Sequence, residues 1–133
     1  MIRDFLLSLI MVVLIAGCSS YSVREQFDKS VEAYNEALRW FEWSNASRYA
    51  EDLIHEEFKA RAAAAKDVRI VDYRIVSKNY DPEKREATVE VDIDYYRLFS
   101  PCVRTLHDTQ KWVYFENKGT KGWKLTSLLP IFK

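Results

Sequence analysis

The sequence predicts an α+β domain in which N-terminal helices pack on a curved antiparallel sheet of about four strands. Three observations predict this class. Apolar residues first recur every three or four positions, and after Lys66 they recur every two. The strands follow one another with short connections, which makes their sheet antiparallel. Helices and strands do not alternate, and this disfavours a doubly wound parallel sheet.

The first helix is marked by an apolar stripe whose spacings of three and four residues describe one helical face. The stripe consists of Val23, Phe27, Val31, Tyr34, Leu38 and Phe41. Ser22 and Glu25 form a capping box at its start. Asn45 is expected to cap a second helix. That helix is expected to continue through Phe58 and the run from Ala62 to Ala65, with a kink near His55.

Four strands are expected in the second half of the chain, at residues 68–80, 86–95, 103–116 and 123–129. In the second of them apolar residues alternate with acidic ones, so one face of the sheet is expected to be solvated. Residues 81–84 and 117–122 have the composition of turns. Ser100 and Pro101 are expected to break or bulge the sheet, and Pro130 is expected to end the last strand.

The N-terminus has the pattern of an export signal. Residues 5–15 are apolar except for Ser8, and this run is shorter than the roughly 20 residues that span a bilayer. It has the length of the apolar region of a signal peptide. The run leads into Ile15-Ala16-Gly17-Cys18, which resembles the lipobox of bacterial lipoproteins.

This resemblance implies a diacylglycerol on the Cys18 sulfur, cleavage before Cys18, and a fatty acid such as palmitate on the new amine. Two or three acyl chains make a durable membrane anchor. The expected organisation is then a signal peptide at 1–17, a lipidated cysteine with a short tether at 18–22, and one α+β domain at 23–133. Ser19, in place of aspartate, implies the outer membrane facing the periplasm if the source is Gram-negative.

The order of elements resembles the nuclear transport factor 2-like superfamily, which includes ketosteroid isomerase and polyketide cyclases. The resemblance extends over about residues 23–132. It is carried by Trp40-Phe41-Glu42-Trp43, the helix at 49–58, the long curved strands, Gln110-Lys111-Trp112 and Gly122-Trp123-Lys124-Leu125. It implies a cone-shaped domain, often with a pocket at its open end. Because the superfamily hosts enzymes and structural modules, the fold does not settle the function.

The third strand supplies the candidate site. Leu106, Asp108, Gln110, Trp112 and Tyr114 share one face of it, and the aromatic residues indicate that this face points to the core. Asp108, Gln110, Trp112 and Tyr114 are therefore candidates to line a pocket. Asp108 can act as a catalytic base with a raised pKa, as the resemblance to ketosteroid isomerase implies. In the structural alternative, which we favour, Asp108 and Gln110 bond to arginine, tyrosine or backbone groups, and an ion pair makes Asp108→Asn destabilising.

Composition and motifs exclude several other functions. The chain has 20 basic and 20 acidic residues, whereas nucleic-acid binding usually needs a basic excess. His55-Glu56-Glu57 is followed by Lys59 in place of a second histidine, so a zinc protease motif is absent. We expect neither a metal nor another cofactor.

An acidic row runs along the outer face of the second strand: Glu86, Glu90, Asp92 and Asp94. Such a row can bind calcium, but a solvated face is the favoured interpretation. Its expected basic neighbours are Arg74, Lys78 and Lys111. Because burying several charges is costly, we expect the domain to be a monomer.

Cys102 is the second cysteine of the chain. We expect it to be buried and inert, or else to pair between molecules. Its use as a nucleophile would require His107 as a base.

The favoured function is a membrane-anchored envelope lipoprotein with a soluble binding or assembly module. Its partner is expected to be an envelope protein or a small apolar ligand. A small enzyme of the isomerase, cyclase or hydratase kind is the alternative, and a structural subunit of an envelope complex is a third possibility. Among these functions the sequence leaves the choice open.

Overall fold

The computed structural model describes residues 23–117 and 119–133. A helix at 23–39 comes first. The elements that follow are α2 (Trp43–Ser47), the 3₁₀ helix η1 (Asp52–Ile54), α3 (His55–Ala64), β1 (Val68–Asp81), β2 (Glu86–Arg97), β3 (Ser100–Asn117) and β4 (Thr120–Leu125). Helices followed by a four-stranded antiparallel sheet confirm the α+β prediction.

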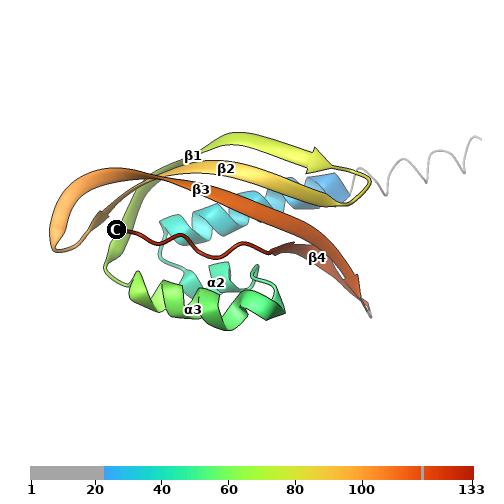
Figure 1. Cartoon of the computed structure of the whole chain (residues 1–133), viewed down its shortest axis with the longest axis horizontal. Helices are drawn as coiled ribbons and strands as arrows, with labels where there is room; N and C mark the ends of the chain where they lie inside the picture. The colour runs from blue at the N-terminus through green and yellow to red at the C-terminus, as the bar shows by residue number, and fades with distance from the viewer. Residues whose placement is uncertain (1–22, 118) are drawn as a thin grey trace, which may run out of the picture.

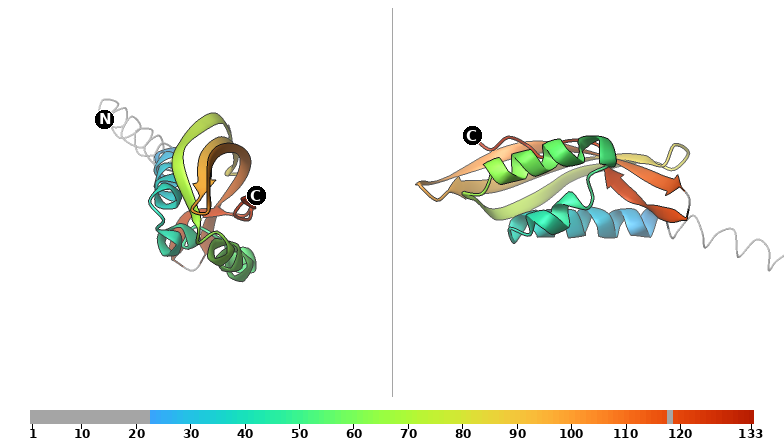
Figure 2. Two further views of the ribbon diagram at one scale, coloured as in Figure 1. Left: turned by 90° about the vertical axis from the view of Figure 1, so that its left-hand side faces the viewer. Right: turned by 90° about the horizontal axis from the view of Figure 1, so that it is seen from below.

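The four strands form a meander in the order β1-β2-β3-β4, and each pairs antiparallel with the next. The sheet is strongly curved, and the helix at 23–39 lies along its concave side (Figure 1). Viewed end-on, the sheet curls around the interior (Figure 2). The segment at 126–133 runs beside α3 (Figure 1), where Leu129 O accepts a hydrogen bond from Arg61 Nη1 at 2.8 Å.

The helix at 23–39 follows the predicted stripe. Phe27, Val31, Tyr34 and Leu38 are all buried. The helix ends two residues before the predicted Phe41, whose φ of 62° lies in the left-handed region. Ser22 lies outside the described residues, so the structure does not describe the predicted capping box.

The second predicted helix is divided into α2, η1 and α3. Asn45 lies inside α2 and does not cap a helix; its Nδ2 donates to Glu42 Oε2 at 3.1 Å. The break has a physical reason, because the backbone of Glu51 leaves the helical path and its N–H donates to Leu125 O at 3.0 Å. α3 then begins at His55, where a kink was predicted.

The strand alternation is confirmed in β2, where buried and partly buried residues alternate from Ala87 to Tyr95. The irregularity predicted at Ser100 and Pro101 is confirmed as a shift in register, because Tyr95 pairs with Arg104 whereas Arg97 pairs with Ser100. The turn lies at residues 98–99, and Pro101 lies inside β3. At this end β3 has no neighbour on its other side, because β4 pairs only with residues 112–117. A proline without an N–H is tolerated on such an edge.

The last strand lies earlier in the chain than predicted: β4 begins at Thr120 and ends at Leu125, well before Leu129. Beyond it, Thr126 N donates to Lys111 O at 2.8 Å. The segment that follows is irregular but still contributes Leu129 and Phe132 to the core.

Candidate functional site

The interior of the curved sheet contains a cluster of buried polar side chains. Alternation along β3 points Asp108 and Gln110 inward, where they are 6% and 1% exposed. The amides of Gln110 and Asn35 bond reciprocally, with Gln110 Nε2 to Asn35 Oδ1 at 2.8 Å and Asn35 Nδ2 to Gln110 Oε1 at 3.3 Å. Gln110 Nε2 also donates to Asp108 Oδ2 at 3.1 Å. This chain of hydrogen bonds joins the helix at 23–39 to the sheet.

Asn35 is a site residue that the sequence analysis missed. It lies four residues after Val31 and donates to Val31 O at 2.9 Å, which fixes the orientation of its amide. Its position beside Tyr34, on the buried stripe, was a usable signal, because a polar residue on an apolar helix face needs a partner. The partner is Gln110, which is 75 residues away in the sequence. The local pattern around Asn35 could not identify it.

Asp108 is a buried carboxyl without an ion pair in the described part of the chain. Burial raises its pKa from 3.8 to about 6, while the hydrogen bond from Gln110 acts in the opposite direction. The expected arginine, tyrosine or backbone partner is replaced by the Gln110 amide. An amide compensates a buried negative charge less well than a guanidinium does, so the carboxylate is costly at neutral pH.

The Tyr34 hydroxyl is buried as well, and it has no hydrogen-bond partner among the described residues. Burial raises the pKa of Tyr34 well above 10, and the charge of Asp108 adds to the effect. The Tyr34 ring packs edge-on against Trp112, with 5.6 Å between the ring centroids. An unpaired buried hydroxyl costs about 1–3 kcal/mol. The site therefore holds two polar groups that are incompletely satisfied.

The predicted pocket residues do not all meet in one place. Trp112 is buried beside Asp108 and Gln110, and its Nε1 lies 3.4 Å from Gln110 Oε1. Tyr114 is farther along β3 and packs against Trp123, with ring centroids 5.6 Å apart. Tyr114 is thus separate from the cluster around Asp108.

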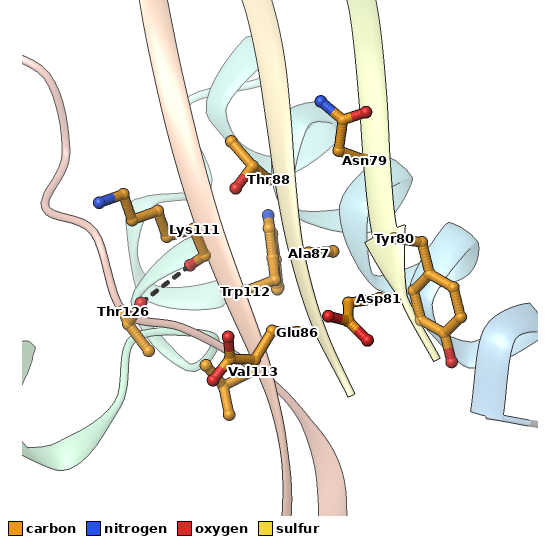
Figure 3. A pocket seen from close by; sticks show the side chains of 10 residues that line it. All are labelled: Asn79, Tyr80, Asp81, Glu86, Ala87, Thr88, Lys111, Trp112, Val113 and Thr126. Carbon is orange, nitrogen blue, oxygen red and sulfur yellow. Dashed lines mark hydrogen bonds between the residues drawn. The ribbon is translucent and has the colours of Figure 1, made fainter. Parts of the chain in front are cut away.

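Four hollows of the described structure lie away from this cluster. One of about 570 Å³ lies between η1 and the β3–β4 end, and two smaller ones of about 180 and 90 Å³ lie near the chain's last residues. Another, of about 470 Å³, lies on the sheet, with β1 on one side and Thr126 on the other (Figure 3). Trp112 is among the lining residues of this last hollow, but Asp108 and Gln110 line none of the four.

The hollow on the sheet has a mixed lining, in which Tyr80, Ala87, Trp112 and Val113 stand beside polar residues. Its lining includes Asp81 and Glu86, which are cross-strand neighbours, together with Thr88 and Lys111 (Figure 3). Thr126 Oγ1 donates to Lys111 O at 3.3 Å and closes one side.

The acidic row is paired in a way that was only partly predicted. Arg74 makes two hydrogen bonds to Asp94, at 2.7 and 3.1 Å, as expected. The bonds lower the pKa of Asp94 to about 2. Lys78 instead pairs with Asp28 on the first helix at 2.9 Å, and Lys111 forms no ion pair within the described residues.

His107 is a partner of the acidic row that the sequence analysis missed. Its Nδ1 lies 2.7 Å from Asp92 Oδ1 and its Nε2 lies 2.6 Å from Glu90 Oε2. These hydrogen bonds, that to Asp92 first, raise the pKa of His107 above 6.5. The imidazolium therefore links two members of the row across β2 and β3.

Cys102 is exposed, so the prediction that it is buried is wrong. It lies near the start of β3, where that strand has a free edge and leaves the thiol open to solvent. Cys102 lines a hollow together with Tyr95 and Arg104, whereas His107 is held by Asp92 and Glu90 on the outer face of the sheet. This arrangement leaves a Cys–His catalytic pair without support.

Two negative findings apply only to residues 23–117 and 119–133. No group of three or more His, Cys, Asp or Glu side chains is placed there to hold a metal ion. No helix in the same part of the chain is long and apolar enough to cross a membrane. Cys18, the predicted lipidation site, lies outside this part.

Comparison with known proteins identifies similar folds. No family model and no curated protein matches the sequence. A crystal structure of a SEC-C motif containing protein from Psychrobacter arcticus is 16% identical with a TM-score of 0.55, over 68% of this chain and 52% of that one. A solution structure of a SEC-C motif containing protein from Rhodopseudomonas palustris is 12% identical with a TM-score of 0.55, over 70% and 69%.

The chain spans about half the length of the first of these structures. At such low identity the likeness shows the fold alone, and no functional residue is transferred to this chain.

Proposed function

We propose that the protein is a lipid-anchored lipoprotein of the cell envelope whose α+β domain, of the nuclear transport factor 2-like kind, is a binding or assembly module. The observation that carries the module proposal is the closed interior around Asp108. Trp112, Tyr34 and Phe58 fill the concave side of the sheet and are all at most 1% exposed. The four hollows described above lie away from the carboxyl. A catalytic base must reach a substrate atom, and Asp108 is covered.

The anchor proposal rests on the sequence from Ile15 to Cys18 and on the apolar run before it. Its test is metabolic labelling with radioactive palmitate in a bacterial host that processes lipoproteins. The parent chain should take up label, and Cys18→Ala should remain an unlabelled, unprocessed precursor. The matched control is Cys102→Ala, which removes the other cysteine and should leave the labelling intact. Label on the Cys18→Ala chain would refute the anchor.

A location in the outer membrane, facing the periplasm, follows for a Gram-negative source, because Ser19 stands where aspartate would retain the protein in the inner membrane. Fractionation of the labelled envelope tests this location. Replacement of Ser19 by Asp should move the label to the inner membrane, and an unchanged distribution would contradict the proposal.

A small isomerase-, cyclase- or hydratase-type enzyme is the second candidate, and one observation favours it. Asp108, with a pKa of about 6, and the unpartnered Tyr34 hydroxyl lie in one apolar interior. Enzymes raise the pKa of a buried carboxyl in this way to obtain a base near neutral pH.

The two candidates differ in whether the interior opens. The apolar dye 1-anilinonaphthalene-8-sulfonate is titrated into the protein, and the ¹³C resonance of the Asp108 carboxyl is recorded. A change in this resonance reports entry of the dye into the interior. In the module the Asp108 resonance stays unchanged while the dye is added. A saturable shift of that resonance, absent from the solvent-facing carboxyl of Asp94, would favour the enzyme.

A further inference from the structure

The end of the molecule formed by the β2–β3 turn exposes large apolar side chains. Phe99, at the turn, is 91% exposed and Leu98 is 48% exposed, while Val103 on β3 adds 56%. A lone exposed apolar residue needs no explanation, but a cluster on a protruding hairpin is typical of an interaction site. The turn lies at one extremity of the long axis (Figure 1).

Basic side chains flank this apolar tip. Lys66 lies just before β1 and Arg69 lies near its start. This segment is joined to the turn, because Leu98 N donates to Asp67 O at 3.0 Å. Arg104 lies on β3 opposite Tyr95. Within the described residues, none of these three cations pairs with a side-chain carboxylate. Arg69 bonds to main-chain oxygens of Lys66 and Val68, and Arg104 bonds to that of Lys133.

The acidic group at this end is already neutralised. Asp67 receives two hydrogen bonds from Arg97 Nη1, at 2.7 and 2.9 Å. Arg97 also donates to the main-chain oxygen of Phe132, which fixes the guanidinium. The tip is therefore apolar at its summit and positively charged at its sides.

We propose that this tip, defined by Leu98, Phe99 and Val103 with Lys66, Arg69 and Arg104 around them, docks on an anionic lipid bilayer. Apolar side chains that enter the acyl boundary, with cations at the level of the headgroups, are the pattern by which proteins bind such surfaces. Each cation near an anionic bilayer contributes about a fivefold gain in binding. The proposal does not depend on the lipid anchor at Cys18.

The acidic row determines the orientation of docking. The outer face of β2 carries four carboxylates: Glu86, Glu90, Asp92 and Asp94. Arg74 and His107 pair with three of them. The carboxylates outnumber these two basic partners, so an anionic surface repels this face. Approach by the sheet face is thus disfavoured, and the tip contacts the bilayer first. The start of the helix at 23–39 lies at the opposite extremity (Figure 1).

The test uses Cys102, an exposed thiol three residues after Phe99, as a reporter. The full chain with Cys18→Ala carries a nitroxide on Cys102 and is mixed with vesicles of phosphatidylcholine, alone or with phosphatidylglycerol. Access of a water-soluble nickel chelate to the nitroxide is measured. With phosphatidylglycerol the access should fall at least fivefold, and salt should restore it because it screens the charges. With phosphatidylcholine alone it should not fall.

Variants separate the two parts of the tip. Lys66→Glu with Arg104→Glu should lower the ratio of inserted to free tip by roughly tenfold or more, and Phe99→Ser should lower it by roughly tenfold. Lys29→Glu, a charge reversal on the first helix, is the matched control and should change nothing.

A second reporter supplies the background. Leu53 on η1 is 92% exposed, and the hollow that it lines carries two acidic residues, Glu51 and Asp52, beside Lys124. A nitroxide on Leu53→Cys, in a chain with Cys18→Ala and Cys102→Ser, should stay accessible in both kinds of vesicle. Equal accessibility of the labels at 102 and 53 in phosphatidylglycerol vesicles would overturn the proposal. So would equal insertion of the tip into phosphatidylcholine, because the charges would then contribute nothing.

Discussion

Replacing Asp108 by asparagine should change the stability of the domain in a pH-dependent way. Burial raises the pKa of Asp108 from 3.8 to about 6. Below pH 3.8 the carboxyl is protonated in the folded and unfolded states alike, and it costs no stability. As the pH rises from 3.8 to 6 the unfolded chain ionises first, so stability falls, and above pH 6 the full cost is present. The sign is opposite to that of a salt-bridged carboxylate.

The magnitude follows from the two pKa values. Linkage gives a cost of about 1 kcal/mol at pH 4.5 and about 3 kcal/mol at pH 7.5. Asparagine has nearly the same shape and no charge, so the stability of Asp108→Asn relative to the parent should rise by about 2 kcal/mol over this range. Any cost of burying the new amide shifts the difference equally at both pH values.

Urea unfolding at pH 4.5 and 7.5 measures this difference. Asp94→Asn is the control, because Arg74 lowers the pKa of Asp94 to about 2. Its substitution should remove a contribution that is present above the unfolded pKa, and therefore should not stabilise the domain as the pH rises. A pH-independent difference for Asp108→Asn would refute the reasoning. The sequence-based expectation of an ion pair predicted a loss of stability, and the structure reverses it.

Three further predictions concern the outer face, the core and the assembly. Because His107 is held by Asp92 and Glu90, its contribution to stability should be complete below pH 6.5 and lost as the pH rises through its raised pKa. NMR titration of His107 should give a pKa above 6.5, and the Asp92→Asn variant should lower it. An unchanged pKa in that variant would contradict the pairing. Trp112→Ala should cost about 3–5 kcal/mol in urea unfolding, since the ring is buried and contacts Tyr34 and Tyr49; a loss below about 1 kcal/mol would mean that the ring is not packed in solution. The domain from Ser19 onward should sediment as a monomer at micromolar concentration, because an interface on the sheet face would bury the acidic row; a tight dimer would show that its basic partners neutralise it.

The parts of the fold that were predicted correctly are those with a strong local period. The stripe from Phe27 to Leu38 and the alternation from Ala87 to Tyr95 each repeat over many residues, and the structure buries both as expected. The ends of elements were less predictable. Asn45 has the right chemistry for a cap, but the Glu51–Leu125 contact sets where the helix breaks.

The candidate site was predictable to the level of one strand face. Period two placed Asp108 and Gln110 inward, and their burial agrees with it. Local pattern carries no information about which side chain comes from another element. Asn35, the partner of Gln110, comes from the first helix, and His107, a partner of the acidic row, comes from the neighbouring strand β3. The roles assigned to Asp108 and Cys18 stay predictions.

The hydrogen bond from Trp123 Nε1 to Val23 O joins residues 100 positions apart. Phe27, four residues after Val23, packs against the same indole, with 4.9 Å between the ring centroids. Tyr80 on β1 stacks on the other side of Phe27, with 5.7 Å between the ring centroids, so the first turns of this helix are only partly covered until β4 has been made. In a growing chain, the contacts between Trp123 and the first helix therefore form after the other strand contacts of that helix, and this end of the core closes last.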